Sequence, residues 1–184
     1  MQIMKSTEII IYTRNYLLYN DFISLSWYLF ILLLVYALTN TVFAVADTKE
    51  IKTNSGIALV ADDVIAHLKG HEDEFDALVF GCGDAVPKFG ENAGKPYNQD
   101  MLAVIKTFGD MGKIMIGHCA AAMMFDSVGI ATGKKVAIHP LAKPAIQHAK
   151  ATDEKFEIDS NFYTAQTENT IWMMMPQVIA ALKE

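Results

Sequence analysis

The chain has 184 residues, of which 52% are hydrophobic and 20% charged, and its formal net charge at pH 7 is −6. This length and apolar content suit one globular domain with a buried core, and the acidic balance without a basic cluster argues against nucleic acid as a partner. Two cysteines without regular Cys/His spacing exclude a disulfide framework, and they give no reason to expect a metal site.

The first forty residues begin with a strand pattern and continue into a segment of unusual composition. Residues 8–13 are rich in isoleucine and tyrosine and predict a strand. From Phe22 to Ala46 there is no charged residue over 25 positions, and 25–38 is apolar on every helical face. A surface helix of an α/β domain should show a polar stripe, so this pattern is closer to a membrane span.

Three interpretations of this segment stay open, and we therefore separate an uncertain part, residues 1–40, from a domain over 41–184. The segment is a membrane anchor or signal, with 44–46 as a small-residue cleavage site, or a divergent first helix buried against a partner subunit, or a replaced N-terminus. Cleavage at 44–46 would remove a predicted strand. A span ending at Leu38 would hold only about 17 residues, the short end of the range. Membrane contact through 22–46 thus remains an alternative.

From residue 41 onward, short apolar runs alternate with helical patterns. Strands are predicted at 41–46, 57–61, 76–80, 113–117, 135–139 and 161–165. Helices are predicted at 63–69, 97–111, 120–128, 141–149 and 170–183. This alternation predicts an α/β domain with a mainly parallel sheet covered by helices on both faces.

The strongest local signal surrounds Cys119. A β-type run breaks at Gly117, and a helix-forming run of alanines starts directly after the cysteine. This is the layout of a nucleophile elbow, in which a tight strand-to-helix turn presents a side chain above the carboxyl edge of a sheet. A sulfur at the start of a helix is favoured as thiolate. The alternative is a small buried hydrophobe, a common role of cysteine.

Two further strand ends carry candidate residues. His139 ends the predicted strand 135–139, and the strand 76–80 runs into the glycine-rich sequence Gly81-Cys-Gly-Asp84. Ligands of open α/β sheets bind at the carboxyl edge, so these residues and Cys119 are expected to meet there. His139 is a candidate proton relay, and its alternative role is that of a hydrogen-bonded structural residue.

The sequences Gly117-His-Cys-Ala-Ala-Ala122 and His139-Pro-Leu-Ala-Lys143, with the upstream glycine turn, resemble the ThiJ/PfpI superfamily. The closest branch is the one that contains the parkinsonism-associated protein deglycase, and the likeness runs from about Thr41 to the C-terminus. It implies a flavodoxin-like, doubly wound fold. It also implies that Cys119 is the reactive cysteine, that the backbone N–H groups of Gly83 and Ala120 bind an oxyanion, and that His139 lies in the site.

The sequence departs from the family at the acid that partners the cysteine. The family takes this acid from the loop after its first strand, where the aligned residue is Asn20 and Asp21 follows. Asn20 cannot transfer a proton, whereas Asp21 restores a proton donor if it shifts into the site, or else caps a helix. His118 is expected to point away from the sulfur, because neighbouring residues of a strand face opposite sides.

Cys82 is the second departure, since it occupies the first position of what is a Gly-Gly turn in the family. At the same sheet edge as Cys119 it is a candidate redox partner that would capture an oxidised sulfur as a disulfide. The alternative is a small packing residue that points down into the sheet.

The resemblance implies an enzyme of glyoxalase or deglycase type that needs no cofactor. Cys119 would attack a small reactive carbonyl, or its early adduct on a protein amine or thiol. A redox-sensing or chaperone-like stress protein with the same oxidisable cysteine is the alternative, and a peptidase is third because it requires a positioned Cys–His pair. We expect a homodimer, and a cytoplasmic domain because a reactive thiol suits a reducing compartment.

Overall fold

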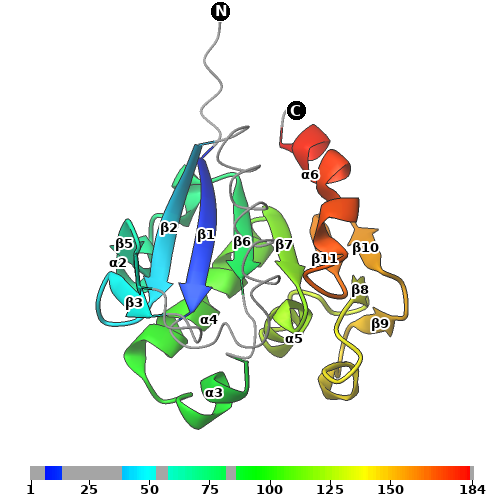
Figure 1. Ribbon diagram of the computed structural model, residues 1–184, viewed down its shortest axis with the longest axis horizontal. Helices are drawn as coiled ribbons and strands as arrows, with labels where there is room; N and C mark the ends of the chain where they lie inside the picture. The colour runs from blue at the N-terminus through cyan, green and yellow to red at the C-terminus, as the bar shows by residue number, and fades with distance from the viewer. Residues whose placement is uncertain (1–6, 14–38, 53–57, 82–85, 183–184) are drawn as a thin grey trace, which may run out of the picture.

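A computed structural model describes residues 7–13, 39–52, 58–81 and 86–182 (Figure 1). Its main sheet has seven strands in the order β10-β11-β7-β6-β1-β2-β5. These strands are β1 (Thr7–Thr13), β2 (Thr39–Val45), β5 (Asp63–Val64), β6 (Ala77–Gly81), β7 (Ile114–His118), β10 (Phe156–Asp159) and β11 (Phe162–Ala165). All neighbours pair in parallel except β10 and β11, which confirms the predicted α/β class with a mainly parallel sheet.

The strand predicted at 8–13 is present as β1, in the interior of the sheet. It pairs with β2 over seven residues, from Thr7 opposite Thr39 to Thr13 opposite Val45, and with β6 on its other side. The residues among the first forty that the structure describes therefore lie in the same sheet as β6 and β7. Within the described ranges, no helix is long and apolar enough to cross a membrane. Most of the uncharged segment, residues 22–38, lies outside those ranges, and its last part forms β2.

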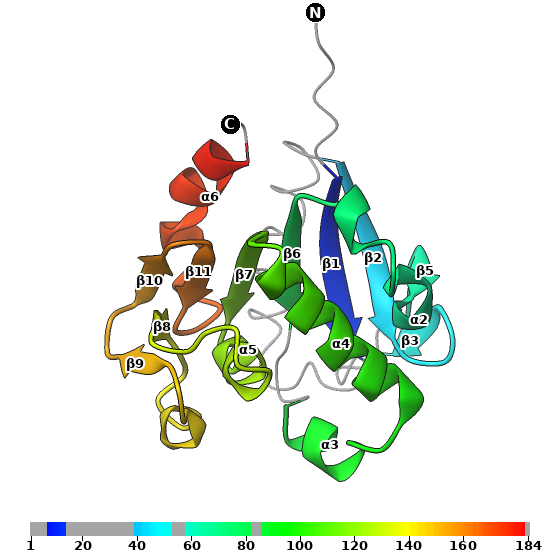
Figure 2. The ribbon, with the colours of Figure 1, turned by 180° about the vertical axis from the view of Figure 1, so that it is seen from behind.

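Helices cover both faces of the sheet. On one face α2 (Ile65–Leu68), α4 (Pro96–Asp110) and α5 (Ala121–Ser127) pack over Leu78, Phe80 and Met115. Figure 2 shows α4 crossing this face. On the other face α6 (Met175–Ala181) and the 3-10 turn η3 (Ile171–Met173) pack over Ala77, Val79 and Ile116. Because both of its faces are covered, β6 is a continuous apolar run without polar alternation.

Helix α4 shows why the sequence forms this layer. It begins with Pro96 in its first turn, where a missing N–H is harmless. Four of its buried residues recur at helical spacing and make one apolar stripe, Met101, Val104, Ile105 and Phe108, and the buried polar residue Asn98 precedes them. At its far end Gly109 lies so close to Ile130 that a Cβ would meet that side chain at 2.6 Å.

Two predicted helices differ in the structure. The helix predicted at 141–149 is wrong: only a 3-10 turn, η2 (Lys143–Ala145), forms there, followed by β9 (Lys150–Thr152) paired with β8 (Lys135–Ala137). Pro144 removes a helical donor, and the N–H groups of 147–149 bond to a buried side chain instead. The helix predicted at 170–183 divides into η3 and α6.

Four smaller elements complete the described chain. The hairpin of β3 (Glu50–Lys52) and β4 (Ala58–Val60) is antiparallel. A short helix, α3 (Val86–Glu91), precedes α4, and a 3-10 turn, η1 (Glu72–Glu74), precedes β6. Since parallel strands end at one edge, β6, β7 and β1 all finish at the bottom of Figure 1, where α5 begins.

Candidate active site

Cys119 lies directly after β7 in a strained backbone conformation. Its φ is +56°, in the left-handed region that side chains other than glycine rarely adopt, and α5 begins two residues later. Two backbone hydrogen bonds fix the turn. The N–H of Cys119 donates to the carbonyl of Ala165 at 3.1 Å, and its own carbonyl accepts the N–H of His139 at 3.0 Å. The residue is half-buried, intermediate between core and surface.

The turn depends on small residues. A Cβ placed on Gly117 would come within 2.5 Å of the Ala121 Cβ and 3.2 Å of the Phe125 ring. Only glycine at this position and alanine at the start of α5 allow the helix to pack directly on the strand. The geometry is that of a nucleophile elbow, as the sequence predicted.

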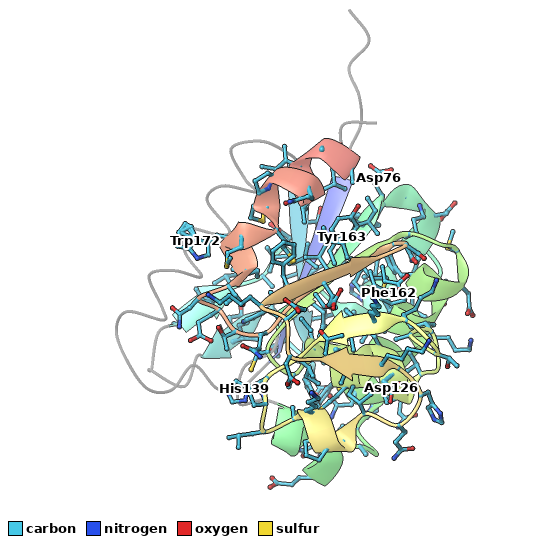
Figure 3. The ribbon with its side chains drawn as sticks, turned by 90° about the vertical axis from the view of Figure 1, so that its right-hand side faces the viewer. Asp76, Asp126, His139, Phe162, Tyr163 and Trp172 are labelled. Atoms are coloured by element: carbon cyan, nitrogen blue, oxygen red, sulfur yellow. The ribbon has the colours of Figure 1, made fainter. Side chains whose placement is uncertain are left out.

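His139 reaches the elbow through its backbone. Its strand, β8, ends at Ala137, and the N–H of His139 then donates to the Cys119 carbonyl. The Nδ1 atom accepts the N–H of Leu141 at 3.3 Å, so a neutral ring carries its proton on Nε2. Cys119 and His139, two of the residues that the sequence assigned to the site, are therefore neighbours. Figure 3 shows His139 at the lower end of the molecule, toward the edge where the strands finish.

His118 lies on the other face of the sheet. Alternation along β7 places Met115 in the core under α4 and α5, and Ile116 in the core under α6. Cys119 packs against the first of these cores. The same alternation puts His118, two residues after Ile116, on the side of Ile116, in line with the expectation that it points away from the sulfur. Burial lowers the pKa of His118 to about 3, so the ring is neutral at physiological pH.

Ala120, one of the two expected oxyanion donors, is the residue that precedes α5. It is buried, and its φ of −94° and ψ of 4° bring the chain from the strained turn into the helix. The other predicted site residues, Asn20, Asp21, Cys82 and Gly83, lie outside the described ranges. The strands that lead to the two cysteines are in register, since Phe80 of β6 pairs with Gly117 of β7.

Asp126 is a residue of this region that the sequence analysis missed. It lies near the end of α5, seven residues after Cys119, and is only 3% exposed. Its carboxylate accepts the backbone N–H groups of Gln147 at 2.7 Å, His148 at 3.0 Å and Ala149 at 2.6 Å. The available signal was a single acidic residue at the end of an otherwise apolar helix.

Among the residues that the structure describes, no group of three or more His, Cys, Asp or Glu side chains is placed to hold a metal ion.

Comparison with known proteins agrees with this geometry. The model of the DJ-1/PfpI family matches residues 27–181. The chain belongs to the DJ-1/PfpI family. The resemblance seen in the sequence and the flavodoxin-like fold are thereby confirmed for this DJ-1/PfpI protein.

Its relatives fall into near and distant groups. Protein ppBat of Bacteroides thetaiotaomicron is 74% identical over 142 residues, which are 77% of this chain and 81% of ppBat. A crystal structure of a protein from the same organism, provisionally named protease I, is 61% identical with a TM-score of 0.87, covering 96% of this chain and 99% of that one. Drosophila melanogaster DJ-1beta is 18% identical with a TM-score of 0.77, covering 97% and 91% of the two chains, a likeness of fold.

Proposed function

We propose that this DJ-1/PfpI protein uses Cys119 as a nucleophile toward small reactive carbonyls, such as 2-oxoaldehydes or their early adducts on protein amines and thiols. The supporting observation is the elbow itself. A left-handed, half-exposed cysteine held by two backbone hydrogen bonds, at 3.1 and 3.0 Å, is fixed before a substrate arrives. Such preorganisation lowers the cost of orienting the reacting atoms.

The reaction begins with attack of the Cys119 thiolate on the aldehyde carbon. A carbon–sulfur bond forms, and the electron pair of the carbonyl bond moves to its oxygen, giving a thiohemiacetal oxyanion. The N–H of Ala120, with that of Gly83 as the resemblance implies, would donate to this oxygen. Transfer of a proton from the aldehyde carbon to the neighbouring carbonyl carbon gives a thioester, and water releases a hydroxy acid and the free thiol.

The proton transfer assigns different tasks to the candidate acid–base groups. With Nδ1 of His139 accepting from Leu141, the neutral imidazole offers an Nε2–H donor, which suits orientation or polarisation of a substrate oxygen. Removal and return of the carbon-bound proton then fall to the loop with Asn20 and Asp21. If Asp21 serves there, Asp21→Asn should lower turnover strongly. If Asn20 occupies the position of the family acid, Asn20→Glu should raise turnover.

The direct test is steady-state formation of lactate from methylglyoxal. Cys119→Ala should abolish turnover, whereas Cys82→Ala, the matched change at the other cysteine, should retain it. In the unaltered protein, alkylation of Cys119 by iodoacetamide should stay fast in mildly acidic buffer, as for a thiolate-favouring site. Equal turnover by the unaltered protein and Cys119→Ala would refute the proposal.

A redox-sensing or chaperone-like role is the second candidate, favoured by Asn20 in place of the family acid and by the half-buried rather than fully buried position of Cys119. Inertness toward methylglyoxal together with rapid peroxide oxidation would support it.

The redox role also predicts a disulfide between Cys82 and Cys119. Each cysteine follows by two residues one member of the strand pair Phe80–Gly117. Mild peroxide should then remove two hydrogens from the intact mass, and Cys82→Ala should prevent this loss. Addition of two oxygens to Cys119, with Cys82 still alkylatable, would contradict it.

A peptidase activity is the third candidate, because a relative is provisionally named protease I. It needs an imidazole that activates the thiol, and the His139 contact described above is made by the backbone. Cleavage of fluorescent casein, lost in Cys119→Ala, would favour it.

We also propose that the protein is a homodimer and is located in the cytoplasm. Light scattering after gel filtration tests the homodimer, and fractionation of cells tests the location. No cofactor or nucleic acid enters the proposed chemistry.

A further inference from the structure

Asp126 carries a buried negative charge that is satisfied by one short stretch of backbone. Oδ2 accepts the N–H of Gln147, and Oδ1 accepts those of His148 and Ala149, at 2.6 to 3.0 Å. A buried carboxylate without partners would be costly, and hydrogen bonds to a charged acceptor are stronger than neutral ones. The carboxylate therefore fixes three consecutive residues against α5.

The stretch that Asp126 holds is the continuation of His139. Residues 139–149 connect β8 to β9, the two strands of a small separate sheet. Successive backbone bonds wind this loop into one unit. They are Ala142 N–H to His139 O at 2.8 Å, Lys143 N–H to His139 O at 3.1 Å, Ala145 N–H to Ala142 O at 3.0 Å and Ile146 N–H to Lys143 O at 3.2 Å.

Both ends of the loop are bound to the same structural unit, the elbow and α5. One end donates from the His139 N–H to the carbonyl of Cys119, and the other end donates to Asp126, seven residues further along the chain from the cysteine. A strained residue keeps its conformation only when its surroundings over-determine it. The bond from His139 is one of the two that hold Cys119 at a positive φ.

We propose that Asp126 is a positioning residue for the reactive cysteine: by holding the loop 139–149 against α5, its carboxylate keeps the His139 N–H on the Cys119 carbonyl and maintains the left-handed turn that presents the sulfur. Asp126 itself does not touch the substrate. The inference rests on the proposed function only in taking Cys119 as the reacting group.

Asp126→Asn is the most informative substitution. It preserves shape, but either orientation of the amide places an NH2 group against at least one backbone N–H, because both carboxylate oxygens accept. Leu68→Ala is the matched control. Leu68 is fully buried in α2, on the β2–β5 side of the sheet, so its loss lowers stability without touching the loop.

The experiment measures amide hydrogen exchange by NMR and the rate of Cys119 alkylation from mildly acidic to mildly alkaline buffer. In Asp126→Asn, exchange at His139 should accelerate by roughly tenfold relative to exchange at Ile116 in β7. Its alkylation profile should also move toward that of an ordinary cysteine. In Leu68→Ala the two amides should change together, and the alkylation profile should stay as in the unaltered protein.

The opposite pattern overturns the inference. If Asp126→Asn loses stability but leaves the His139-to-Ile116 exchange ratio and the alkylation profile unchanged, Asp126 only stabilises the fold. If Asp126→Asn does not fold, Gln147→Pro replaces it, since this change removes one donor to the carboxylate and Ile146, at φ −70° and ψ 129°, already suits a following proline. None of these readouts requires turnover, so failure of the carbonyl chemistry and failure of this inference are separate results.

Discussion

The elbow and the loop 139–149 lie against each other, yet their conformations have different origins. The elbow is specified locally: Gly117 admits Ala121, and the helix starts where the alanines start. The loop has a helical pattern in its sequence and still forms only a single 3-10 turn, because its N–H groups bond to a carboxylate on another element. Packing between residues close in the sequence, such as Gly117 and Ala121, can be recognised from the sequence. Hydrogen bonds from the loop backbone to a side chain about twenty residues away, such as those to Asp126, cannot.

The largest effect is expected from removing the Asp126 carboxylate, which accepts the hydrogen bonds that shape the loop. Asp126→Ala removes the buried acceptor of three partly buried backbone N–H groups and should lower the free energy of unfolding by about 3 kcal/mol. Asp110→Ala is the control, since it removes an exposed carboxylate paired with Lys106 one helical turn away and should cost about 0.5 kcal/mol. Denaturant unfolding measures both. Similar losses in the two variants would show that the loop does not depend on Asp126.

The next effect tests the local fit of the elbow. Gly117→Ala places a Cβ 2.5 Å from Ala121 and should destabilise the protein by about 1–3 kcal/mol through overpacking. Gly90→Ala in α3 meets nothing within 4 Å and should be neutral or slightly stabilising, as in an exposed helix. Thermal unfolding of the pair measures the difference. A tolerated alanine at 117 would mean that α5 can withdraw from β7.

The pH dependence of stability probes the residue beside the elbow. Burial lowers the pKa of His118 from 6.5 to about 3, so between these two pH values the unfolded chain binds a proton at this histidine and the folded protein does not. His118 therefore does not reduce the free energy of unfolding above pH 6.5. As the pH falls from 6.5 toward 3, the free energy of unfolding should decrease by about 1 kcal/mol per pH unit. His118→Gln should flatten this slope, whereas His67→Gln, at an exposed position on α2, should preserve it. An unchanged slope in His118→Gln would assign the acid sensitivity to other groups.

The smallest effect isolates the strain at the cysteine. Cys119→Gly and Cys119→Ala both remove the sulfur, but only alanine keeps a Cβ at φ +56°. The glycine variant should therefore be more stable than the alanine variant by about 0.5–1 kcal/mol, after the entropy that glycine loses on folding. Paired denaturant curves measure this difference. Equal stabilities would mean that the turn relaxes when the sulfur is removed.

These contrasts explain how much the sequence could predict. The strand β1, the parallel sheet and the elbow follow from apolar runs and small residues close together in the chain. His139 lies beside Cys119 as expected, but through a backbone hydrogen bond from the end of β8, which belongs to a separate two-stranded sheet with β9. The loop could not be predicted, because an isolated acidic residue at the end of α5 does not reveal which N–H groups it will bind. The acid partner of the sulfur stays a prediction. Either Asn20 or Asp21 occupies the position of the family acid, and both residues lie outside the described ranges.

The place of β1 has a consequence for shortened forms of the chain. β1 pairs with β2 on one side and β6 on the other, so it joins the two halves of the main sheet. A polypeptide that began after Thr13 would present the backbone donors and acceptors of β2 and β6 as two open edges facing a gap. Unpaired edges of this kind recruit strands from other molecules. We would expect such a fragment to assemble edge to edge and to be recovered as aggregate, even with every residue of the elbow intact.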